Sequence, residues 1–228
     1  MNVRSLLSNS DDSSLSLLNM NNILLHDTRS KIVEIGRLLY KRHLTDSAGG
    51  NISIKVNDQI CISPRRSGSN FQWNITPEQV CVVDIKGNKI EGEGEPSREL
   101  NVHLKLHTEF VDFGRAVIHA HPRNILVFAS TKTPIIPILE NSMKFGITPI
   151  IDYHPACSQK LADAVTASLK GREDIIYNHA AGVIVPRHGL FLMGRDINAA
   201  YDAVERLELN AYCILMSKLI ESDIANSK

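Results

Sequence analysis

Alternating apolar and polar residues run through several segments of this chain and predict β-strands. Side chains two positions apart on a strand point to the same face, so such alternation is typical of strands that bury one face. Two hairpins are predicted, one turning at Asn57 and Asp58 and the other at Gly87 and Asn88. The predicted strands occupy residues 51–56, 59–63, both arms of 79–90, 116–122, 135–139, 147–151, and the apolar segments 182–186 and 189–193.

Apolar residues three or four positions apart predict helices between these strands. The predicted helices span 27–43, 97–112, a segment from Pro122, 157–170 and 197–222. Their apolar stripes include Ile32, Ile35, Leu38 and Leu39 in the first helix, and Leu100, Leu104, His107 and Val111 in the second. Ser97 is expected to be the N-cap of the second helix, and the loop at 63–74 is expected to be too polar for the core.

Hairpin signals outnumber strand–helix–strand alternation. The expected fold is therefore a single α/β domain, in which a largely antiparallel central sheet is covered by helices on its faces. Residues 1–26 are rich in Ser, Asn and Asp and are predicted to be a flexible or appended N-terminal segment, so the domain is expected at 27–228.

Composition narrows the class of protein. The chain has 228 residues, 43% of them hydrophobic, and its 25 basic residues balance its 25 acidic ones. Zero formal net charge gives no sign of a nucleic-acid partner, and the lack of a long apolar run gives no sign of a membrane partner. The four cysteines are scattered without a CxxC pair, which favours reduced thiols and a cytoplasmic location.

The strand AVIHAHP carries the most informative chemistry. His119 and His121 lie two positions apart, so both project from one face and can chelate one metal ion. His188, between two apolar segments, and Glu99, after a turn-like EGEGEPS, are further candidate ligands. Imidazole and carboxylate suit Zn²⁺, and also Mn²⁺, Fe²⁺ or Co²⁺, and a centre with three protein ligands leaves room for substrate.

Histidine in an apolar segment is more often a hydrogen-bonded core residue than a ligand. His103 and His107 follow Glu99 at helical intervals and share one face with it. They could form a second metal motif, but no glutamate adjoins either as in HExxH, so packing within the fold is the favoured interpretation.

Four motifs in order, SAGGNIS, EPSRE, HAHP and RHG, resemble the class II aldolase and adducin-like family over about residues 28–220. The resemblance implies that His119, His121 and His188 bind the metal and that Glu99 is a ligand or catalytic base. It also implies a phosphate pocket, made of Gly50, Asn51, Gly68 and Ser97, in which the backbone N–H groups of the SAGGN turn meet the anion. The resemblance further implies a homotetramer with active sites between subunits.

The activity implied is metal-dependent cleavage of a ketose 1-phosphate, of the fuculose 1-phosphate type, to dihydroxyacetone phosphate and an aldehyde. Glu140 falls where the aldolases place a tyrosine from the neighbouring subunit, and related methylthioribulose-phosphate dehydratases place a glutamate nearby. Glu140 is thus a candidate catalytic residue, or simply a solvated loop carboxylate. Arg98, Arg65 and Arg66 depart from the aldolase pattern and could grip an anionic substrate.

Several alternatives share this family. A dehydratase, a 4-epimerase or a decarboxylase of phosphorylated oxo-acids would use the same metal site, although the epimerases typically carry aspartate where this chain has Glu99. A non-catalytic adducin-like interaction domain is the alternative of another class. The complete set of three histidines and Glu99 favours an enzyme.

Overall fold

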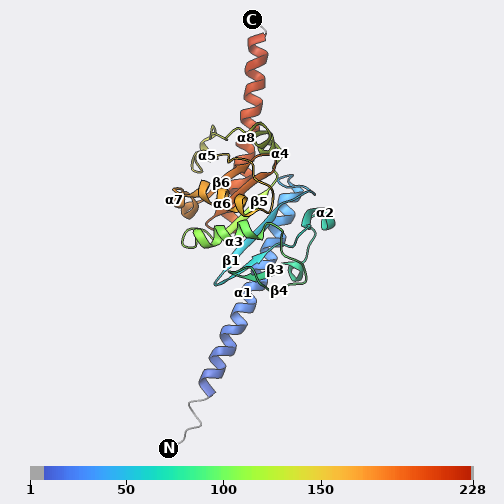
Figure 1. The fold of residues 1–228 in the computed structure, drawn as a ribbon, viewed down its shortest axis with the longest axis vertical. Coiled ribbons are helices and arrows are strands. Elements are labelled where there is room, and N and C mark those ends of the chain that lie inside the picture. The colour runs from blue at the N-terminus through green and yellow to red at the C-terminus, as the bar shows by residue number, and fades with distance from the viewer. Residues whose placement is uncertain (1–7, 227–228) are drawn as a thin grey trace, which may run out of the picture.

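The computed structural model describes residues 8–226, with side-chain surroundings from 20 to 225. Two long helices begin and end the chain and project from opposite ends of a compact sheet-and-helix body (Figure 1). The elements are α1 (Ser8–Lys41), β1 (Asn51–Val56), β2 (Gln59–Ile62), α2 (Ser67–Phe71), the 3₁₀ turn η2 (Pro77–Gln79), β3 (Cys81–Asp84), β4 (Lys89–Glu91), α3 (Leu100–Glu109), β5 (Ala116–Ala120), α4 (Arg123–Thr131), α5 (Glu140–Met143), α6 (Gln159–Leu169), α7 (Glu173–Asn178), β6 (Ala180–Val185), β7 (Gly189–Gly194) and α8 (Ile197–Asn226).

All the strands pair antiparallel in one seven-stranded sheet of order β4-β3-β2-β1-β5-β7-β6. The predicted antiparallel sheet and both hairpins are therefore confirmed. The strands predicted at 135–139 and 147–151 are wrong, because these segments make only isolated bridges, Ile135 to Thr148 and Ile150 to Ile184. Prolines within both segments lack the N–H that a continuous ladder needs.

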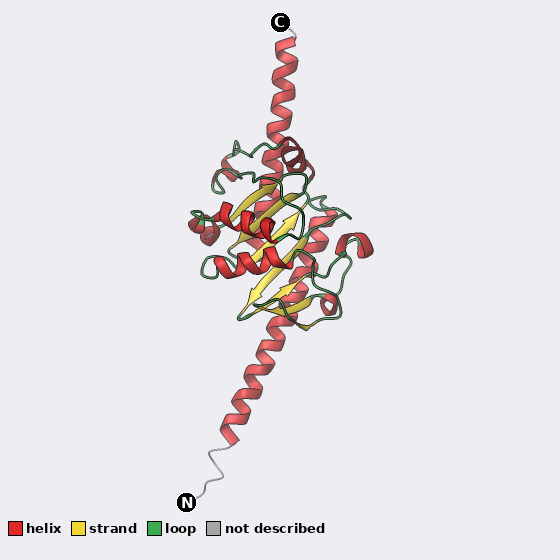
Figure 2. Ribbon diagram, in the orientation of Figure 1, coloured by secondary structure: helices red, strands yellow, loops and turns green. Residues whose placement is uncertain are grey.

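Helices cover both faces of this sheet, as expected (Figure 2). One face packs against α1, α4 and α8, and its core includes Ile32, Leu39 and Leu207. The other face packs against α3, α6 and α7, with Leu106 and Val165 in its core. Strand β5 lies near the middle of the sheet and is buried along its whole length, so polar groups on it must find partners inside the protein.

Helix α1 runs without a break from Ser8 to Lys41, through the boundary expected at residue 27. Residues 1–7 of the predicted N-terminal segment lie outside the described residues. The stripe predicted on this helix is largely buried, with Ile32, Ile35 and Leu39 in the core. Across the described part of the chain, we find no helix that is both long and apolar enough to cross a membrane.

Two local predictions are wrong. Helix α3 begins at Leu100 with Glu99 as its N-cap. Ser97 instead closes the turn ahead of the helix, where its hydroxyl accepts the N–H of Glu99 and its carbonyl accepts the N–H of Leu100. The stripe predicted on this helix is partly right: His107 is buried and Leu100 and Leu104 are half-buried, but Val111 is exposed, and the fully buried apolar residues are Val102 and Leu106. The loop at 63–74 is not wholly polar surface either: its Trp73 is fully buried and packs so close to Gly36 that a β-carbon there would lie 2.3 Å from the indole.

Candidate metal centre and active-site cavity

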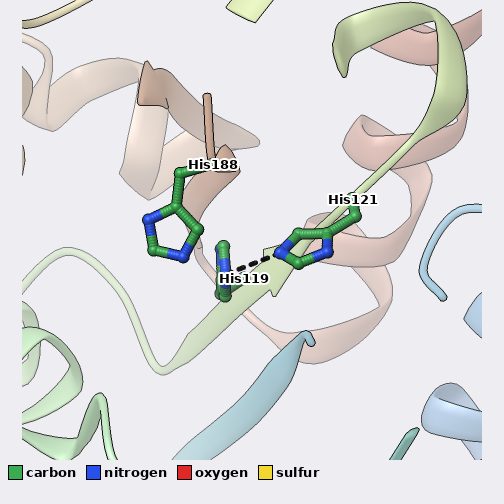
Figure 3. A group of neighbouring side chains, drawn as sticks. All are labelled: His119, His121 and His188. Atoms are coloured by element: carbon green, nitrogen blue, oxygen red, sulfur yellow. Dashed lines mark hydrogen bonds between the residues drawn. The ribbon is translucent and has the colours of Figure 1, made fainter. Parts of the chain in front are cut away.

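Three imidazole rings converge at one end of the central strands, as Figure 3 shows for His119, His121 and His188. Their potential ligand atoms all lie within 4.8 Å of one another. The Nε2 atoms of His119 and His121 are 3.2 Å apart. The structure thus brings together the three histidines that the sequence analysis named as metal ligands, and their metal-binding role stays a prediction.

The sheet register produces this convergence. His119 is the fourth residue of β5 and lies opposite Phe191 of β7, with the two rings stacked at a centroid distance of 4.1 Å. His121 follows just beyond the strand on the same face. His188 lies in the tight turn that joins β6 to β7, and because β7 pairs with β5 this turn reaches the same end of the sheet.

Hydrogen bonds fix the tautomers of two of these rings. The Nδ1–H of His119 donates to the Leu190 carbonyl at 3.0 Å, and the Nδ1–H of His121 donates to Asp46 at 3.1 Å. Both Nε2 atoms are then bare lone pairs that face the centre. Burial, with the neighbouring imidazoles, holds the pKa of His119 well below its usual value, and burial also lowers the pKa of His188. Neutral imidazoles are the form that binds metals.

Glu99 faces these histidines from the start of α3. Its Oε2 lies 3.3 Å from Nε2 of His119, and its Oε1 lies 3.2 Å from Nε2 of His188. The carboxylate is buried, yet Oε1 has no hydrogen-bond partner among the described residues. A buried carboxylate oxygen left open beside three converging imidazoles fits a divalent cation, so this donor set suits a metal.

A cavity of about 400 Å³ opens above the histidines. It brings together most of the site residues predicted from the sequence, namely Gly50, Asn51, Gly68, Ser97, Arg98, Glu99, His119, His121 and His188. Arg65 and Arg66 also line it. Glu140 does not: it lies exposed on α5, away from the residues that surround this cavity.

The family model for the class II aldolase and adducin N-terminal domain matches residues 30–215. The chain belongs to this family. It is 32% identical over 180 residues to the L-fuculose phosphate aldolase of Methanococcus maripaludis, covering 78% of this chain and 91% of that protein. A solved structure of L-fuculose 1-phosphate aldolase superposes with a TM-score of 0.73 at 25% identity, covering 85% of this chain and 87% of the other. The predicted family and enzyme class, a lyase of the class II aldolase type, are confirmed.

More distant relatives of this class II aldolase carry other names. A 3-oxo-tetronate 4-phosphate decarboxylase of Haemophilus influenzae is 26% identical, over 79% of this chain and 83% of that protein. A methylthioribulose-1-phosphate dehydratase of Pseudomonas syringae is 22% identical, over 83% and 95% respectively. Family membership alone therefore leaves the reaction to be argued from the site.

Glycines of this aldolase permit close backbone approach at the cavity. Gly50 has φ +92°, and a β-carbon there would lie 2.4 Å from the Thr45 hydroxyl. A β-carbon on Gly68 would lie 2.5 Å from the backbone oxygen of Asp46. Both positions therefore require glycine, and the turn before β1, which leads to Gly50, packs against helix α2, which carries Gly68, at the cavity wall.

Some phosphate contacts expected from the sequence differ in the structure. The N–H groups of Ala48 and Gly49, expected to meet an anion, instead donate to the Asp46 carboxylate at 2.9 and 3.2 Å. The side-chain amide of Asn51 donates to Glu99 and accepts from His103. The phosphate-binding role of Asn51 stays a prediction, and the structure gives its side chain other partners.

Sequence reasoning missed two residues at this site. Asp46 orients His121, and its carboxylate also closes the turn that precedes β1. Cys157 lines the cavity from the loop before α6. A carboxylate four residues before Gly50 is a weak signal, because Asp is common in any turn. Cys157 stands alone in a polar loop, so the sequence gives no signal of a role at the site.

An Asp46→Ala variant is expected to bind Zn²⁺ about 10- to 100-fold more weakly, because loss of a hydrogen-bond partner behind a ligating histidine has this typical cost. Titration calorimetry on metal-stripped protein measures the affinity directly. Asp58→Ala, in the β1–β2 hairpin turn, is the matched control and should leave zinc affinity unchanged. Equal zinc affinity of Asp46→Ala and the wild type would contradict the role of Asp46.

Proposed function

We propose that this protein is a metal-dependent aldolase that cleaves a ketose 1-phosphate, of the fuculose 1-phosphate type, to dihydroxyacetone phosphate and an aldehyde. The observation that carries the proposal is the buried Glu99 carboxylate beside a cluster of three histidines, which together line a cavity large enough for a sugar phosphate. The similarity to named L-fuculose phosphate aldolases supports the substrate class.

His119, His121 and His188 would hold the metal, with Glu99 as a further ligand or as the base. A bound Zn²⁺, or Mn²⁺, Fe²⁺ or Co²⁺ in its place, supplies Lewis-acid stabilisation of the negative charge that develops on the substrate. Glu99 accepts the substrate hydroxyl proton as the carbon–carbon bond breaks and its electron pair stays on the ketose fragment.

The phosphate of the substrate binds in the same cavity, against Gly50, Gly68 and Ser97. Arg98 is exposed and lines the same cavity, so its guanidinium can pair with phosphate oxygens. Anchoring the unreactive phosphate end orients the reacting carbons toward Glu99.

Glu140 enters this proposal from a neighbouring subunit, since within one chain it is exposed and remote from the cavity. The assembly proposed is a homotetramer with active sites between subunits. At each site Glu140 acts as an acid or base, in the place where the aldolases have a tyrosine from the neighbouring subunit. A cytoplasmic location agrees with the free, buried thiols of Cys61 and Cys81.

A decarboxylase of a phosphorylated oxo-acid is the second candidate. Three arginines, Arg65, Arg66 and Arg98, line one cavity, which is more cationic charge than a phosphate monoester alone requires. A substrate with both a phosphate and a carboxylate would use them. The distant relative named as a 3-oxo-tetronate 4-phosphate decarboxylase gives this candidate its precedent.

The test is a product assay of the zinc-loaded protein against a panel of ketose 1-phosphates that includes L-fuculose 1-phosphate. Dihydroxyacetone phosphate is expected only with metal-loaded protein, and metal-stripped protein is the control. No dihydroxyacetone phosphate from any ketose, together with CO₂ release from 3-oxo-tetronate 4-phosphate, would replace the aldolase with the decarboxylase.

A further inference from the structure

We propose that His107, Ser53 and His103 form a one-directional chain of hydrogen bonds that positions Glu99 through the side chain of Asn51. The proposal rests on the proposed function only where it names Glu99 as the base; the chain itself stands on geometry. Its links are short: His107 to Ser53 is 2.7 Å, Ser53 to His103 is 2.6 Å, His103 to Asn51 is 2.5 Å, and Asn51 to Glu99 is 3.0 Å.

The carboxylate fixes the direction of every link. An ionised Glu99 can only accept, so the Asn51 group that faces its Oε2 must be the NH₂. The Asn51 carbonyl oxygen then faces Nε2 of His103, which must carry the proton. The bare Nδ1 of His103 therefore accepts a hydrogen bond from the Ser53 hydroxyl.

Ser53 has a single proton, so its oxygen must accept the bond from Nε2–H of His107. The Nδ1 atom of His107 is left bare, and it is buried without a hydrogen-bond partner among the described residues. Both rings are neutral, because burial lowers the pKa of His103 and of His107 to about 3. The predicted alternative of a second metal motif is not needed to explain these two histidines.

The strand β1 and the helix α3 place their side chains at nearly equal spacings, and this match makes the chain of hydrogen bonds possible. Asn51 and Ser53 are two apart on β1 and share one face, with a spacing of roughly 6.6 Å. His103 and His107 are four apart on α3, with a spacing of roughly 6 Å. The near-equal spacings let both histidines reach Ser53, while Glu99 at the N-cap meets Asn51.

This arrangement gives the Asn51 side chain a role different from phosphate binding. Both ends of its amide are occupied, one by Glu99 and one by His103. The Asn51 NH₂ group donates to Oε2 of Glu99. The other oxygen, Oε1, has no hydrogen-bond partner among the described residues and faces His188. Asn51, His103 and Ser53 are thus positioning residues for Glu99.

The imidazole tautomers test the chain without any assay of activity. Long-range ¹H–¹⁵N correlation spectra of the ¹⁵N-histidine-labelled full chain should show both His103 and His107 as neutral Nε2–H tautomers at pH 7. An Nδ1–H tautomer or a charged ring at His103 would overturn the proposal, whether or not the protein proves to be an aldolase. If instead both tautomers are as expected and no aldolase activity is found, only the proposed function fails.

Variants then separate positioning from phosphate binding. Asn51→Ala and Ser53→Ala are expected to lower kcat about 10- to 100-fold with KM nearly unchanged, since each removes an outer hydrogen bond to a reacting group. His103→Gln, which keeps an N–H donor for Asn51, should retain more activity than His103→Leu. Thr166→Val is the matched control, because Thr166 on α6 is a buried hydroxyl that, unlike Ser53, has no hydrogen-bond partner among the described residues.

Affinity for inorganic phosphate, measured by calorimetry, decides between the two roles of Asn51. The proposal expects the same affinity in Asn51→Ala and the wild type. Phosphate affinity lowered tenfold in Asn51→Ala, with kcat unchanged, would overturn it. Should Ser53→Ala fail to fold, the tautomers of the wild-type chain still decide the question.

Discussion

A Glu99→Gln variant is expected to lose about 10²- to 10⁴-fold in kcat, the usual contribution of a positioned general base. Glutamine keeps the shape of the side chain, and its carbonyl oxygen can still accept the hydrogen bond from the Asn51 amide. It cannot act as a base, because it has no carboxylate to take up a proton. The measurement is steady-state kinetics on the ketose 1-phosphate that the wild type cleaves best, with bound metal determined in parallel.

Glu109→Gln is the matched control, because Glu109 ends the same helix and is partly exposed in an ion pair with Lys170. It should have wild-type kcat. A Glu99→Gln enzyme that keeps its metal and its full kcat would remove Glu99 from the chemistry. Loss of metal in this variant would instead identify Glu99 as a ligand.

A His119→Ala variant is expected to bind no stoichiometric metal and to lose about 10³-fold or more in kcat/KM. Lewis-acid stabilisation contributes several kcal/mol, and each 1.36 kcal/mol is a factor of ten in rate. Elemental analysis after gel filtration measures the metal, and a thermal unfolding scan checks that loss of the stack on Phe191 leaves the protein folded. Metal bound at wild-type stoichiometry in a folded His119→Ala protein would contradict the assignment of the centre.

His179→Ala is the control for that experiment. His179 ends α7 and contributes to a different cavity, with Lys144 and Arg195 beside it. Its replacement should leave both metal content and kcat/KM unchanged. The comparison separates loss of a ligand from loss of any one imidazole.

Periodic signals in the sequence predicted what depends on strand and helix geometry. Alternation placed His119 and His121 on one face, and helical spacing placed His103 and His107 on the face shared with Glu99. Neither signal could name Ser53 as the partner of both histidines, because that contact joins residues 50 and 54 positions apart. Contacts between distant segments depend on how the elements pack, and one sequence does not specify this.

Other errors have equally local causes. A lone tryptophan among polar residues carries no periodicity, so the buried position of Trp73 was missed. Apolar runs such as 135–139 resemble strands, yet their prolines limit them to single bridges. Ser97 has the composition of an N-cap, but it caps the turn at Arg98 and Glu99, and the helix itself begins two residues later than this signal indicates.

The position of the histidines in the sheet links metal binding to the stability of the folded state. His119 and His188 become neighbours only after β7 has paired with β5, a contact between segments about 70 residues apart in the chain. Closing so long a loop costs conformational entropy, which the pairing of the two strands must offset. A metal ion that needs both residues therefore binds the native state alone, and at 1,000 times its Kd it adds about 4.1 kcal/mol to the free energy of unfolding. Cellular metal supply would then set how long each molecule resists unfolding and proteolysis, as well as whether it is active.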